Sequence, residues 1–369
     1  MNVADFDFEL PPDLIAQEPS AERSDARLLH LARETGIIAH SAVSALPSLL
    51  LPGDLVIVNN TRVFPARLIG HRVPSGGSVE CVLLAPVGVR PVSDPPQTGG
   101  SDTGLTPGQL WEALVHPGQK LKPGALVRFD GVTPLHGEIL ERRAYGRRLV
   151  RLWTEDGSPV DAAVDAVGHV PLPPYIKRKD SAADRDRYQT IFADRRGSVA
   201  APTAGLHFTV ALVDALRARQ IEIAEVTLHV GYGTFQPVRV DIVEEHRLEA
   251  ERFEIAEPAA AAINRALDEG RRVIAVGTTT TRTLEAAALA RDDPGGRIHA
   301  GAGTTSLFIY PGFTFRVVSG LLTNFHLPKS SLLMLVSAFG GRAPVMAAYR
   351  EAVRRGYRFY SYGDAMLVI

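Results

Sequence analysis

The sequence predicts an α/β protein, in which a small all-β, barrel-like domain is inserted into an α/β core domain. An apolar run at residues 55–58 is typical of a strand buried on both faces. Residues 60–159 offer short β-rich runs with almost no helical periodicity, whereas residues 160–369 alternate strands with helices. We therefore expect a discontinuous catalytic core at 1–59 and 160–369, interrupted by the barrel-like domain at 60–159.

The inserted zone is expected to contain six strands, because turn residues separate six short β-rich runs. They lie at 63–72, 79–86, 110–116, 125–129, 135–142 and 147–153. The segment 87–109 is rich in Pro, Gly, Ser, Asp and Thr, which indicates a flexible surface insertion. Cys81 is the one cysteine, so the chain has no disulfide framework or cysteine zinc site, and we expect a small apolar strand residue there.

The elements of the third zone follow from periodicity and from helix-end signals. Residues 344–355 begin with Pro344 and are followed by Gly356, with one apolar stripe between them, as in an amphipathic helix. Thr209 is a fair N-cap for another helix. The other expected strands are 221–230, 272–277 and 307–310, and the other expected helices are 259–269, 281–290 and 332–339.

Composition limits the classes of function. The chain has 40 Lys and Arg residues against 41 Asp and Glu residues, a net charge of −1, which excludes a protein that coats polyanions non-specifically but permits a local basic patch. Neither a metalloenzyme histidine pair nor a Gly-x-Ser-x-Gly elbow is present, which disfavours metalloenzymes and hydrolases. An acidic N-terminus and the lack of an apolar run near ~18 residues favour a cytoplasmic protein without membrane contact.

Polar residues and glycines concentrate in four loops. His207 precedes the helix capped by Thr209, and a helix N-terminus favours the neutral imidazole, which can accept a proton. The alternative for His207 is a histidine satisfied by nearby backbone. His229 leaves a strand just before Gly231 and Gly233, which allow a ligand to approach the backbone closely.

The other two loops carry hydroxyls and amides. Thr278 and Thr279 follow a buried strand and lead into a helix, where open α/β sheets place ligands, so they suit a carboxylate, a phosphate or a ribose. The alternative is an over-capped helix start with Arg282 exposed. Asn324 and His326 precede an apolar helix and are either site residues or part of a buried capping network.

Charged residues gather in three places. The segment 244–251 is typical of a solvated surface. Two basic clusters are able to contact phosphates. The alternative for the first is a solvated hairpin without a ligand, and for the second, nearby aspartates reduce the net positive charge. Their members are Arg142, Arg143, Arg147 and Arg148 in a predicted hairpin, and Lys177, Arg178 and Lys179 after it.

Several long strings are particular enough to indicate a family. They are FDFELP at 6–11, GDLVIVNNTRVFPAR at 53–67, PLPPYI at 171–176, VAAPTAGLHFT at 199–209, LHVGYGTF at 228–235, GTTTTRTL at 277–284, LTNFHLPKS at 322–330 and YSYGDAM at 360–366. Together they resemble the S-adenosylmethionine:tRNA ribosyltransferase-isomerase family of queuosine biosynthesis, nearly end to end. One departure is Glu249, which replaces the second histidine of the family's His-x-Met-His-x-Glu stretch.

The resemblance implies an enzyme that consumes S-adenosylmethionine as a ribosyl donor and needs no cofactor or metal. The implied acceptor is the aminomethyl group of a 7-deazaguanine at the wobble position, so the partner is a tRNA anticodon stem-loop that carries this precursor. Adenine and methionine leave, and the ribose carbons become the epoxycyclopentane ring of epoxyqueuosine. We expect a monomer.

The resemblance also suggests roles for residues. The sulfonium acidifies the ribose C5′ hydrogens, so we expect His229 or His207 to be the base, and the other of these two or His326 to deliver a proton to adenine. The expected substrate-binding residues are Asn59, Asn60, Thr61, Arg62, Thr203, Gly205, Gly231, Gly233, Thr278, Thr279, Arg282 and Asn324. Phosphates of the tRNA are expected to contact either the hairpin arginines or residues 177–179.

Two other functions fit parts of the sequence. An ordinary S-adenosylmethionine methyltransferase would use Gly231 and Gly233, and its product would be S-adenosylhomocysteine. An RNA-binding barrel on an inactive α/β support would bind tRNA without turnover. The long uncharged polar loops argue against mere binding, which does not require them.

Overall fold

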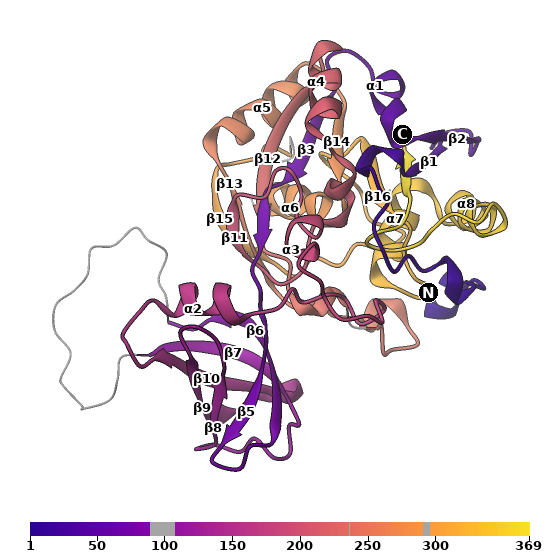
Figure 1. The fold of residues 1–369 in the computed structure, drawn as a ribbon. Coiled ribbons are helices and arrows are strands. Elements are labelled where there is room, and N and C mark those ends of the chain that lie inside the picture. The colour runs from indigo at the N-terminus through magenta and orange to yellow at the C-terminus, as the bar shows by residue number, and fades with distance from the viewer. Residues whose placement is uncertain (89–107, 236, 291–295) are drawn as a thin grey trace. The chain divides into compact units, whose positions relative to one another are not determined.

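The computed structural model describes residues 1–88, 108–235, 237–290 and 296–369. The described chain divides into two compact units, which we call the core unit and the barrel unit (Figure 1). The core unit comprises Met1–Arg62, Pro173–Lys179 and Asp186–Ile369, and the barrel unit comprises Val63–Leu172 and Asp180–Arg185. The expected fold class, an α/β core with an inserted all-β barrel, is confirmed.

A mixed sheet of nine strands, counted over the described residues, forms the centre of the core unit. In spatial order its strands are β15 (Gly301–Thr305), β13 (Glu251–Ile255), β12 (Glu222–Leu228), β3 (Leu55–Asn59), β14 (Val273–Val276), β16 (Gly320–Asn324), β17 (Ala365–Val368), β1 (Arg27–Leu31) and β2 (Ile38–Ala42). The central strands β12, β3, β14 and β16 run parallel, while β13 and β17 run antiparallel to them. The carboxyl ends of four parallel strands therefore meet at one edge of the sheet.

Both faces of this sheet are covered by helices, because successive residues of a strand point to opposite faces. Leu55 and Ile57 belong to the apolar cluster on one face, and Val56 and Val58 belong to the cluster on the other. The first cluster contains residues of α5 (Glu257–Asp268), α6 (Thr278–Leu289), α7 (Ser331–Gly340) and α8 (Arg342–Arg354), and the second contains residues of α1 (Leu46–Leu49) and α4 (Val210–Ala218). The doubly buried strand predicted at 55–58 is confirmed.

Most of the predicted elements of the core unit are present, with bounds shifted by a few residues. Thr209 caps α4 by accepting a hydrogen bond from the backbone N–H of Leu212 at 3.1 Å. The strand predicted at 307–310 is wrong, because the strand lies at Gly301–Thr305 and ends there. Beyond it, the N–H of Leu307 donates to the side chain of Thr305 and its carbonyl accepts from Arg282, so side chains replace the ladder partners of a strand.

The barrel unit contains a closed barrel, formed by six strands of its described residues. Around the barrel they are β10 (Arg147–Thr154), β7 (Gln109–His116), β6 (Ser78–Pro86), β5 (Arg67–Val73), β8 (Leu126–Phe129) and β9 (Leu135–Arg142), which matches the six predicted runs. Cys81 is buried in β6, as expected for a small apolar residue. Of the predicted insertion at 87–109, residues 89–107 lie outside the described residues.

The division between the units differs from the expected bounds of the insertion. Helix α2 (Val160–Val167) packs against β9 and β10, so residues 160–172 belong to the barrel unit and not to the core. The short elements are β4 (Thr61–Val63), β11 (Arg195–Ser198), α3 (Asp184–Arg187) and the 3₁₀ helices η1 (Val3–Phe6), η2 (Pro12–Leu14), η3 (Arg23–Asp25), η4 (Val43–Ala45), η5 (Ala144–Gly146), η6 (Thr203–His207), η7 (Tyr232–Phe235) and η8 (Val243–Glu245).

Candidate active site

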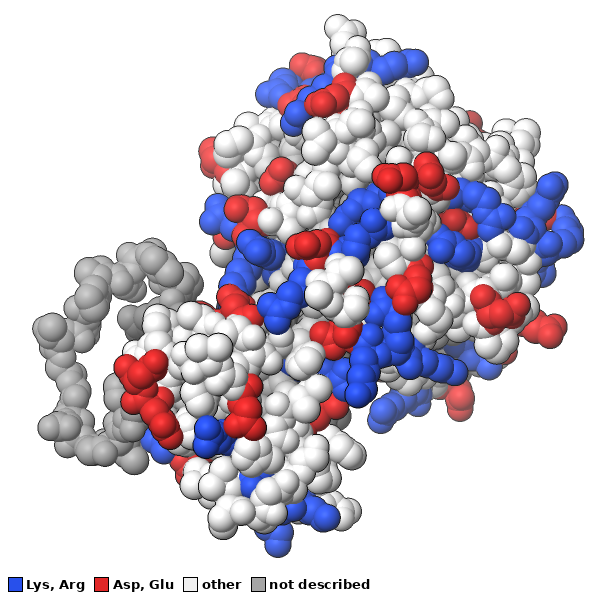
Figure 2. Space-filling model, in the orientation of Figure 1, with Lys and Arg blue, Asp and Glu red and all other residues white. Residues whose placement is uncertain are grey.

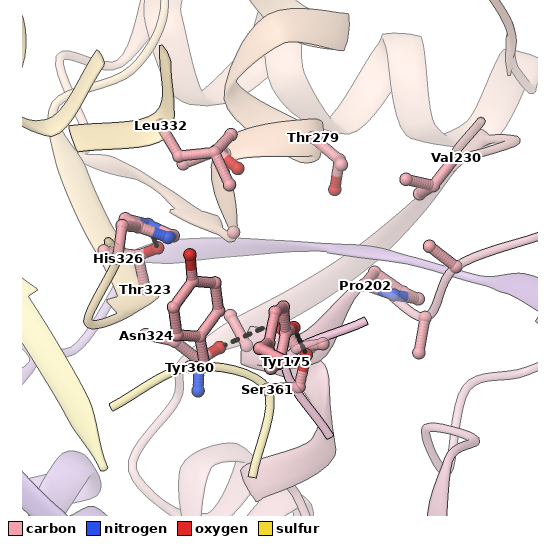
Figure 3. Close-up of a pocket in the computed structure, with 16 residues that line it drawn as sticks. Tyr175, Pro202, Val230, Thr279, Thr323, Asn324, His326, Leu332, Tyr360 and Ser361 are labelled. Carbon is pink, nitrogen blue, oxygen red and sulfur yellow. Dashed lines mark hydrogen bonds between the residues drawn. The ribbon is translucent and has the colours of Figure 1, made fainter. Parts of the chain in front are cut away.

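A pocket of about 600 Å³, which we call the central pocket, lies in the core unit at the carboxyl ends of β14 and β16 (Figure 3). Residues 277–279 follow β14, and residues 323–326 end and follow β16. The other walls come from residues 200–204 and 360–361 and from single residues of other segments. The central pocket therefore occupies the position where open α/β sheets bind their ligands.

The N-terminus of α6 forms one wall, and its four threonines divide into two pairs. Gly277 caps the helix at φ 91°, a backbone conformation that favours glycine. Thr280 and Thr281 are fully buried, and their hydroxyls donate to main-chain carbonyl oxygens one turn earlier, at 2.7 and 3.1 Å. Thr278 and Thr279 line the pocket, close to first-turn N–H groups that have no acceptor within a helix. This wall suits an anionic or hydroxyl-bearing ligand.

A chain of hydrogen bonds leads from the pocket into the protein through Asn324. Thr203 donates its hydroxyl to Oδ1 of Asn324 at 2.9 Å, and Nδ2 of Asn324 donates to Nε2 of His207 at 3.1 Å. Thr203 and Asn324 line the central pocket, whereas His207 is buried and lines a smaller neighbouring pocket. Burial lowers the pKa of His207 to about 4, so its neutral ring can accept the amide hydrogen.

His326 is the histidine, among the three predicted to be catalytic, that lines the central pocket. Its Nε2 lies 3.0 Å from the hydroxyl of Thr323, and its backbone N–H donates to the hydroxyl of Tyr349 at 3.1 Å. Burial lowers the pKa of His326 to about 3. The ring is therefore neutral at pH 7, and Nδ1 is the nitrogen that can serve a ligand.

Two tyrosines that the sequence did not single out form the opposite side of the pocket. In Figure 3, Tyr175 and Tyr360 lie across the pocket from Thr279 and Leu332. The two phenol rings stack with centroids 3.9 Å apart, and the hydroxyls of Tyr175 and Ser361 are hydrogen-bonded. Both tyrosines lie in irregular segments, so no periodicity marks them, although each belongs to a string that carries the family resemblance.

His229 and its neighbours form a separate cluster where β12 and β3 end. Nδ1 of His229 lies 2.8 Å from the hydroxyl of Thr61, and burial lowers the pKa of this histidine to about 4. Asn59 joins the two strands to α6, because its side chain bonds both backbone groups of Leu228 and contacts Oγ1 of Thr279 at 3.5 Å. His229, Thr61 and Asn59 are not among the residues that line the central pocket.

A second pocket, of about 280 Å³, is built around Arg282 and is called the Arg282 pocket below. Arg282 is 3% exposed and pairs with the buried carboxylate of Glu251, whose other oxygen accepts the N–H of Gly231 at 2.9 Å. The NH2 group of Arg282 is buried without a hydrogen-bond partner among the described residues. Gly233 and Glu249 also line this pocket.

The alternative considered for Arg282 and the prediction for the segment 244–251 are therefore wrong. Arg282 is not exposed at a helix start, and the segment 244–251 is not uniformly solvated, because Glu251 begins β13 and faces inward. The rest of that segment is mostly exposed, as predicted. The physical reason is that the charges of Arg282 and Glu251 can be buried only when they are paired with each other. The two residues come from different elements, so the pattern of one helix or one strand does not reveal the pair.

Five predicted substrate-binding residues lie outside both pockets: Asn59 and Thr61, whose contacts are given above, and Asn60, Arg62 and Gly205. Asn60 donates to Glu225 at 3.1 Å and accepts the hydroxyl of Thr227 at 2.7 Å. The side chain of Arg62 is exposed. Gly205 faces Thr190 so closely that a Cβ atom would come within 2.9 Å of its methyl group, which makes Gly205 a packing residue.

The two basic clusters predicted to bind tRNA differ in how far their charges are compensated. In the barrel unit, Arg147 pairs with Glu112 at 2.8 Å, and Arg143 lies near Glu112 and Glu141. Arg148 is 6% exposed and donates to main-chain carbonyls, so it does not offer a surface charge. Successive strand residues alternate in direction, which places Arg148 inside and its neighbour outside. Arg142 is exposed.

In the core unit, the cluster at 177–179 is less compensated. Lys177 and Lys179 are exposed, and Arg178 pairs with Glu18 at 2.6 Å. Across the described parts of the chain, no group of three or more His, Cys, Asp or Glu side chains is placed to hold a metal ion. No single described helix is long and apolar enough to span a membrane, and only α7 and α8 taken together, with a bend of 118° between them, have the required length and composition.

Comparison with known proteins gives one consistent result. The model of the queuosine biosynthesis protein family matches residues 3–368. The S-adenosylmethionine:tRNA ribosyltransferase-isomerases of Heliobacterium modesticaldum and Desulfitobacterium hafniense are 50% and 48% identical to this chain, each over 100% of both chains. A crystal structure of S-adenosylmethionine tRNA ribosyltransferase from Thermotoga maritima aligns with a TM-score of 0.52 and 36% identity, covering 99% of this chain and 100% of that one. The chain therefore belongs to the queuosine biosynthesis protein family.

Proposed function

We propose that this protein is an S-adenosylmethionine:tRNA ribosyltransferase-isomerase. It transfers and isomerises the ribosyl moiety of S-adenosylmethionine onto the aminomethyl group of 7-aminomethyl-7-deazaguanine at the wobble position of tRNA. Its products are epoxyqueuosine in the tRNA, adenine and methionine. The observation that carries this proposal is the 50% identity, over the whole of both chains, to a relative of that name.

The central pocket is the proposed site of the ribosyl donor. Its described lining holds no Lys or Arg, so no like charge opposes the cationic sulfonium. The faces of Tyr175 and Tyr360 attract a cation through the aromatic quadrupole. Thr278 and Thr279 offer hydroxyls to the ribose from the opposite wall.

His326 is the proposed base that removes a hydrogen from C5′ of the ribose. A pKa of about 3 reflects the difficulty of adding a charge to this buried ring. The bound sulfonium changes that balance, because deprotonation of C5′ neutralises the positive sulfonium centre as an ylide while the imidazolium forms. The pocket then holds the same net charge before and after the step. His326 can also return the proton, since the departing adenine needs one.

Asn324 is the proposed recognition group for adenine. Thr203 and His207 use one lone pair and one N–H of its amide, which leaves one acceptor site and one donor site. These are the two groups with which an asparagine pairs to N6 and N7 of adenine. His207 acts here as a positioning residue, because it touches Asn324 and not the pocket.

The Arg282 pocket is the proposed site of the methionine end of S-adenosylmethionine. The unpartnered NH2 group of Arg282 suits the carboxylate, and the carboxylates of Glu251 and Glu249 suit the ammonium. Thr279 and Arg282 lie three residues apart on α6, so one ligand can reach from the central pocket to this one. Glu249 would then bind the ammonium group of the substrate at a position where the family has a histidine.

For the tRNA, the cluster at 177–179 is the better supported of the two predicted contacts. It follows Tyr175 of the central pocket, and its two lysines are exposed. The barrel arginines are largely paired or buried. A monomer suffices for this reaction because a single chain lines both pockets, and we infer a cytoplasmic enzyme because tRNA resides there.

The proposal is tested by incubating the protein with S-adenosylmethionine, labelled in the ribose, and an anticodon stem-loop that carries the precursor base. Nucleoside analysis should show the label in epoxyqueuosine, with adenine and methionine released in equal amounts. A stem-loop with guanine at the wobble position is the control and should release no adenine. Formation of S-adenosylhomocysteine would identify a methyltransferase, and binding of the stem-loop without turnover would identify an RNA-binding protein.

A further inference from the structure

A third pocket of the core unit, of about 290 Å³, adjoins the central pocket and is called the arginine pocket below. Ser361 lines both pockets, so the two share part of a wall. His207 also lines the arginine pocket, and its Nε2 is the acceptor for Asn324 of the central pocket. The arginine pocket takes its name from Arg23 and Arg187, which form part of its lining.

The guanidinium groups at this pocket are held by neutral oxygens. Arg23 donates to the main-chain carbonyls of Gln189 at 2.7 Å and Asp186 at 3.0 Å. Arg187 donates to the carbonyl of Ala21 at 3.0 Å and to that of Ser20. Within the described residues, neither side chain has a carboxylate within ion-pair distance.

A third guanidinium lies beside them. Arg358 donates to the hydroxyl of Ser20, which lines the pocket, and to the carbonyl of Glu18 at 3.4 Å. The neighbouring carboxylate of Asp364 is paired with Arg27 at 3.0 Å, and it accepts the backbone N–H of Arg358. The pocket is therefore bordered by three positive charges whose contacts do not neutralise them.

The positive charges at the arginine pocket affect the pKa values of Arg23 and His207. Burial lowers the pKa of Arg23 and the positive charge of Arg187 lowers it further, while smaller contributions from Tyr362 and the carboxylate of Asp186 raise it. Burial also dominates the lowered pKa of His207, and the charges of Arg358 and Arg23 add to it, against Asp364 and a backbone bond to Arg23. Like charges held this close repel each other, so a bound anion would stabilise the arrangement. Figure 2 shows that Lys and Arg side chains form several groups on the drawn face of the core unit.

We propose that the arginine pocket binds a backbone phosphate of the tRNA nucleotide whose base enters the central pocket. This inference rests on the proposed function and deepens it by naming a site for the tRNA. A nucleotide carries its phosphate one sugar away from its base, and the two pockets share one wall. Planar guanidinium groups match the oxygens of a phosphate.

The chemistry of the other pockets supports this occupant. The Arg282 pocket combines the ion pair of Arg282 and Glu251 with a second carboxylate, that of Glu249, which suits an amino acid zwitterion. The arginine pocket offers positive charge without a carboxylate in its lining, which suits a phosphate and would repel the ammonium group of a methionine. The guanidinium groups are also fixed in place by main-chain carbonyls, so the site is formed before the ligand arrives.

The first arm of the test uses the wild-type protein and alters the RNA. Neutral methylphosphonates replace, one at a time, the phosphates on either side of the precursor nucleotide in the anticodon stem-loop. We expect one of the two to raise the KM for the stem-loop by roughly 10- to 100-fold, the effect of losing a charged hydrogen-bonded contact. A methylphosphonate in the stem serves as the control and should change KM little.

The second arm alters the protein. Arg187→Met should raise the same KM, and with this variant the sensitive methylphosphonate should cause little further loss. The salt dependence of stem-loop binding should fall in slope by about 0.7 for one lost phosphate contact. Arg187→Lys keeps the charge and should retain part of the affinity, while Arg217→Met, on the exposed end of α4, is the matched control.

The outcomes separate the two proposals. A wild-type protein that releases no adenine from S-adenosylmethionine would refute the proposed function. Normal release with both methylphosphonates tolerated would refute the arginine pocket as a phosphate site, even if Arg187→Met fails to fold. A higher KM for S-adenosylmethionine in Arg187→Met, with the KM for the stem-loop unchanged, would assign the pocket to the donor instead and would also overturn the inference.

Discussion

The amide of Asn324 donates to Nε2 of His207 at 3.1 Å, so a histidine buried behind the wall of the central pocket orients a side chain that faces the ligand. The same amide accepts the hydroxyl of Thr203 at 2.9 Å. The bond to Nε2 depends on the neutral form of His207, which burial favours by lowering its pKa to about 4. The orientation of Asn324 is therefore determined from within the protein before a ligand binds.

His207→Ala should lower kcat/KM for adenine release by roughly 10- to 100-fold, because a misplaced group in an active site loses about that much. His207→Gln should recover part of the loss, since its amide oxygen can accept the same hydrogen. Asn324→Ala and the double variant complete the cycle, and the double variant should be little worse than either single one. Full additivity would contradict the coupling, and His299→Ala, at an exposed histidine, is the control.

His326→Gln should reduce kcat by about 10²- to 10⁴-fold, the usual contribution of a positioned general base, and should leave the KM for S-adenosylmethionine within a few-fold. Glutamine keeps a hydrogen-bonding group next to Thr323 but cannot take a proton. The direct measurement is exchange of deuterium from solvent into C5′ of the donor. Exchange at the wild-type rate in this variant would remove His326 from the role of base.

Arg282→Met leaves the carboxylate of Glu251 buried without a partner, and we expect the free energy of unfolding to fall by roughly 3–5 kcal/mol. The double variant Arg282→Met/Glu251→Leu removes both charges and should regain most of that stability. Its KM for S-adenosylmethionine should nevertheless stay raised by more than about tenfold, since a charge-assisted contact is lost.

Denaturant unfolding and donor kinetics on the same samples separate the two roles of Arg282. A stable double variant with wild-type KM would make the pair purely structural. The matched control is Arg265→Met, which breaks an exposed pair with Glu222 and should change stability by less than about 1 kcal/mol.

Stability should fall as the pH is lowered from about 6.5. The pKa values of His207 and His326 in the folded protein, about 4 and about 3, lie below the ordinary value of 6.5. The unfolded chain therefore binds more protons within this window, and the stability present above pH 6.5 is lost as the pH falls towards the folded values. Each histidine contributes a slope of up to about 1.4 kcal/mol per pH unit.

His326→Gln removes one of these histidines, so between pH 6 and 5 its free energy of unfolding should depend less steeply on pH than that of the wild-type protein. Equal slopes in the wild-type protein and His326→Gln would show that the imidazole of His326 is protonated as readily in the folded state as in the unfolded chain.

The two predicted tRNA contacts should respond differently to charge reversal. Lys177→Glu with Lys179→Glu should weaken binding of the stem-loop and reduce its salt dependence, because both side chains are exposed. Arg143→Glu with Arg147→Glu should have a smaller effect, since glutamates already compensate those arginines. Filter binding at several salt concentrations measures both, and the reverse order of effects would assign the contact to the barrel.

Local patterns in the sequence were enough to predict much of the fold. The doubly apolar run at 55–58, the six barrel strands and the amphipathic α8 each show a periodicity that burial of one or two faces imposes. The rule that open α/β sheets bind ligands at the carboxyl ends of their strands singled out Thr278 and Thr279, and both line the central pocket. Asn324 and His326 also line it, but β16, the strand that places them there, was not predicted. Apolar patterning is a property of short segments, so it can be interpreted without the rest of the chain.

The sequence by itself therefore determined many of the helices and strands, the position of Thr278 and Thr279 after a buried strand, and the strings that identify the family. Tertiary structure decided which polar groups meet. Arg282 turns inward because Glu251 reaches it from another strand, Tyr175 stacks on Tyr360 from a distant segment, and His207 lies behind Asn324. A polar side chain is buried only when its partner is placed with hydrogen-bonding geometry, and that partner is supplied by packing between segments far apart in the chain.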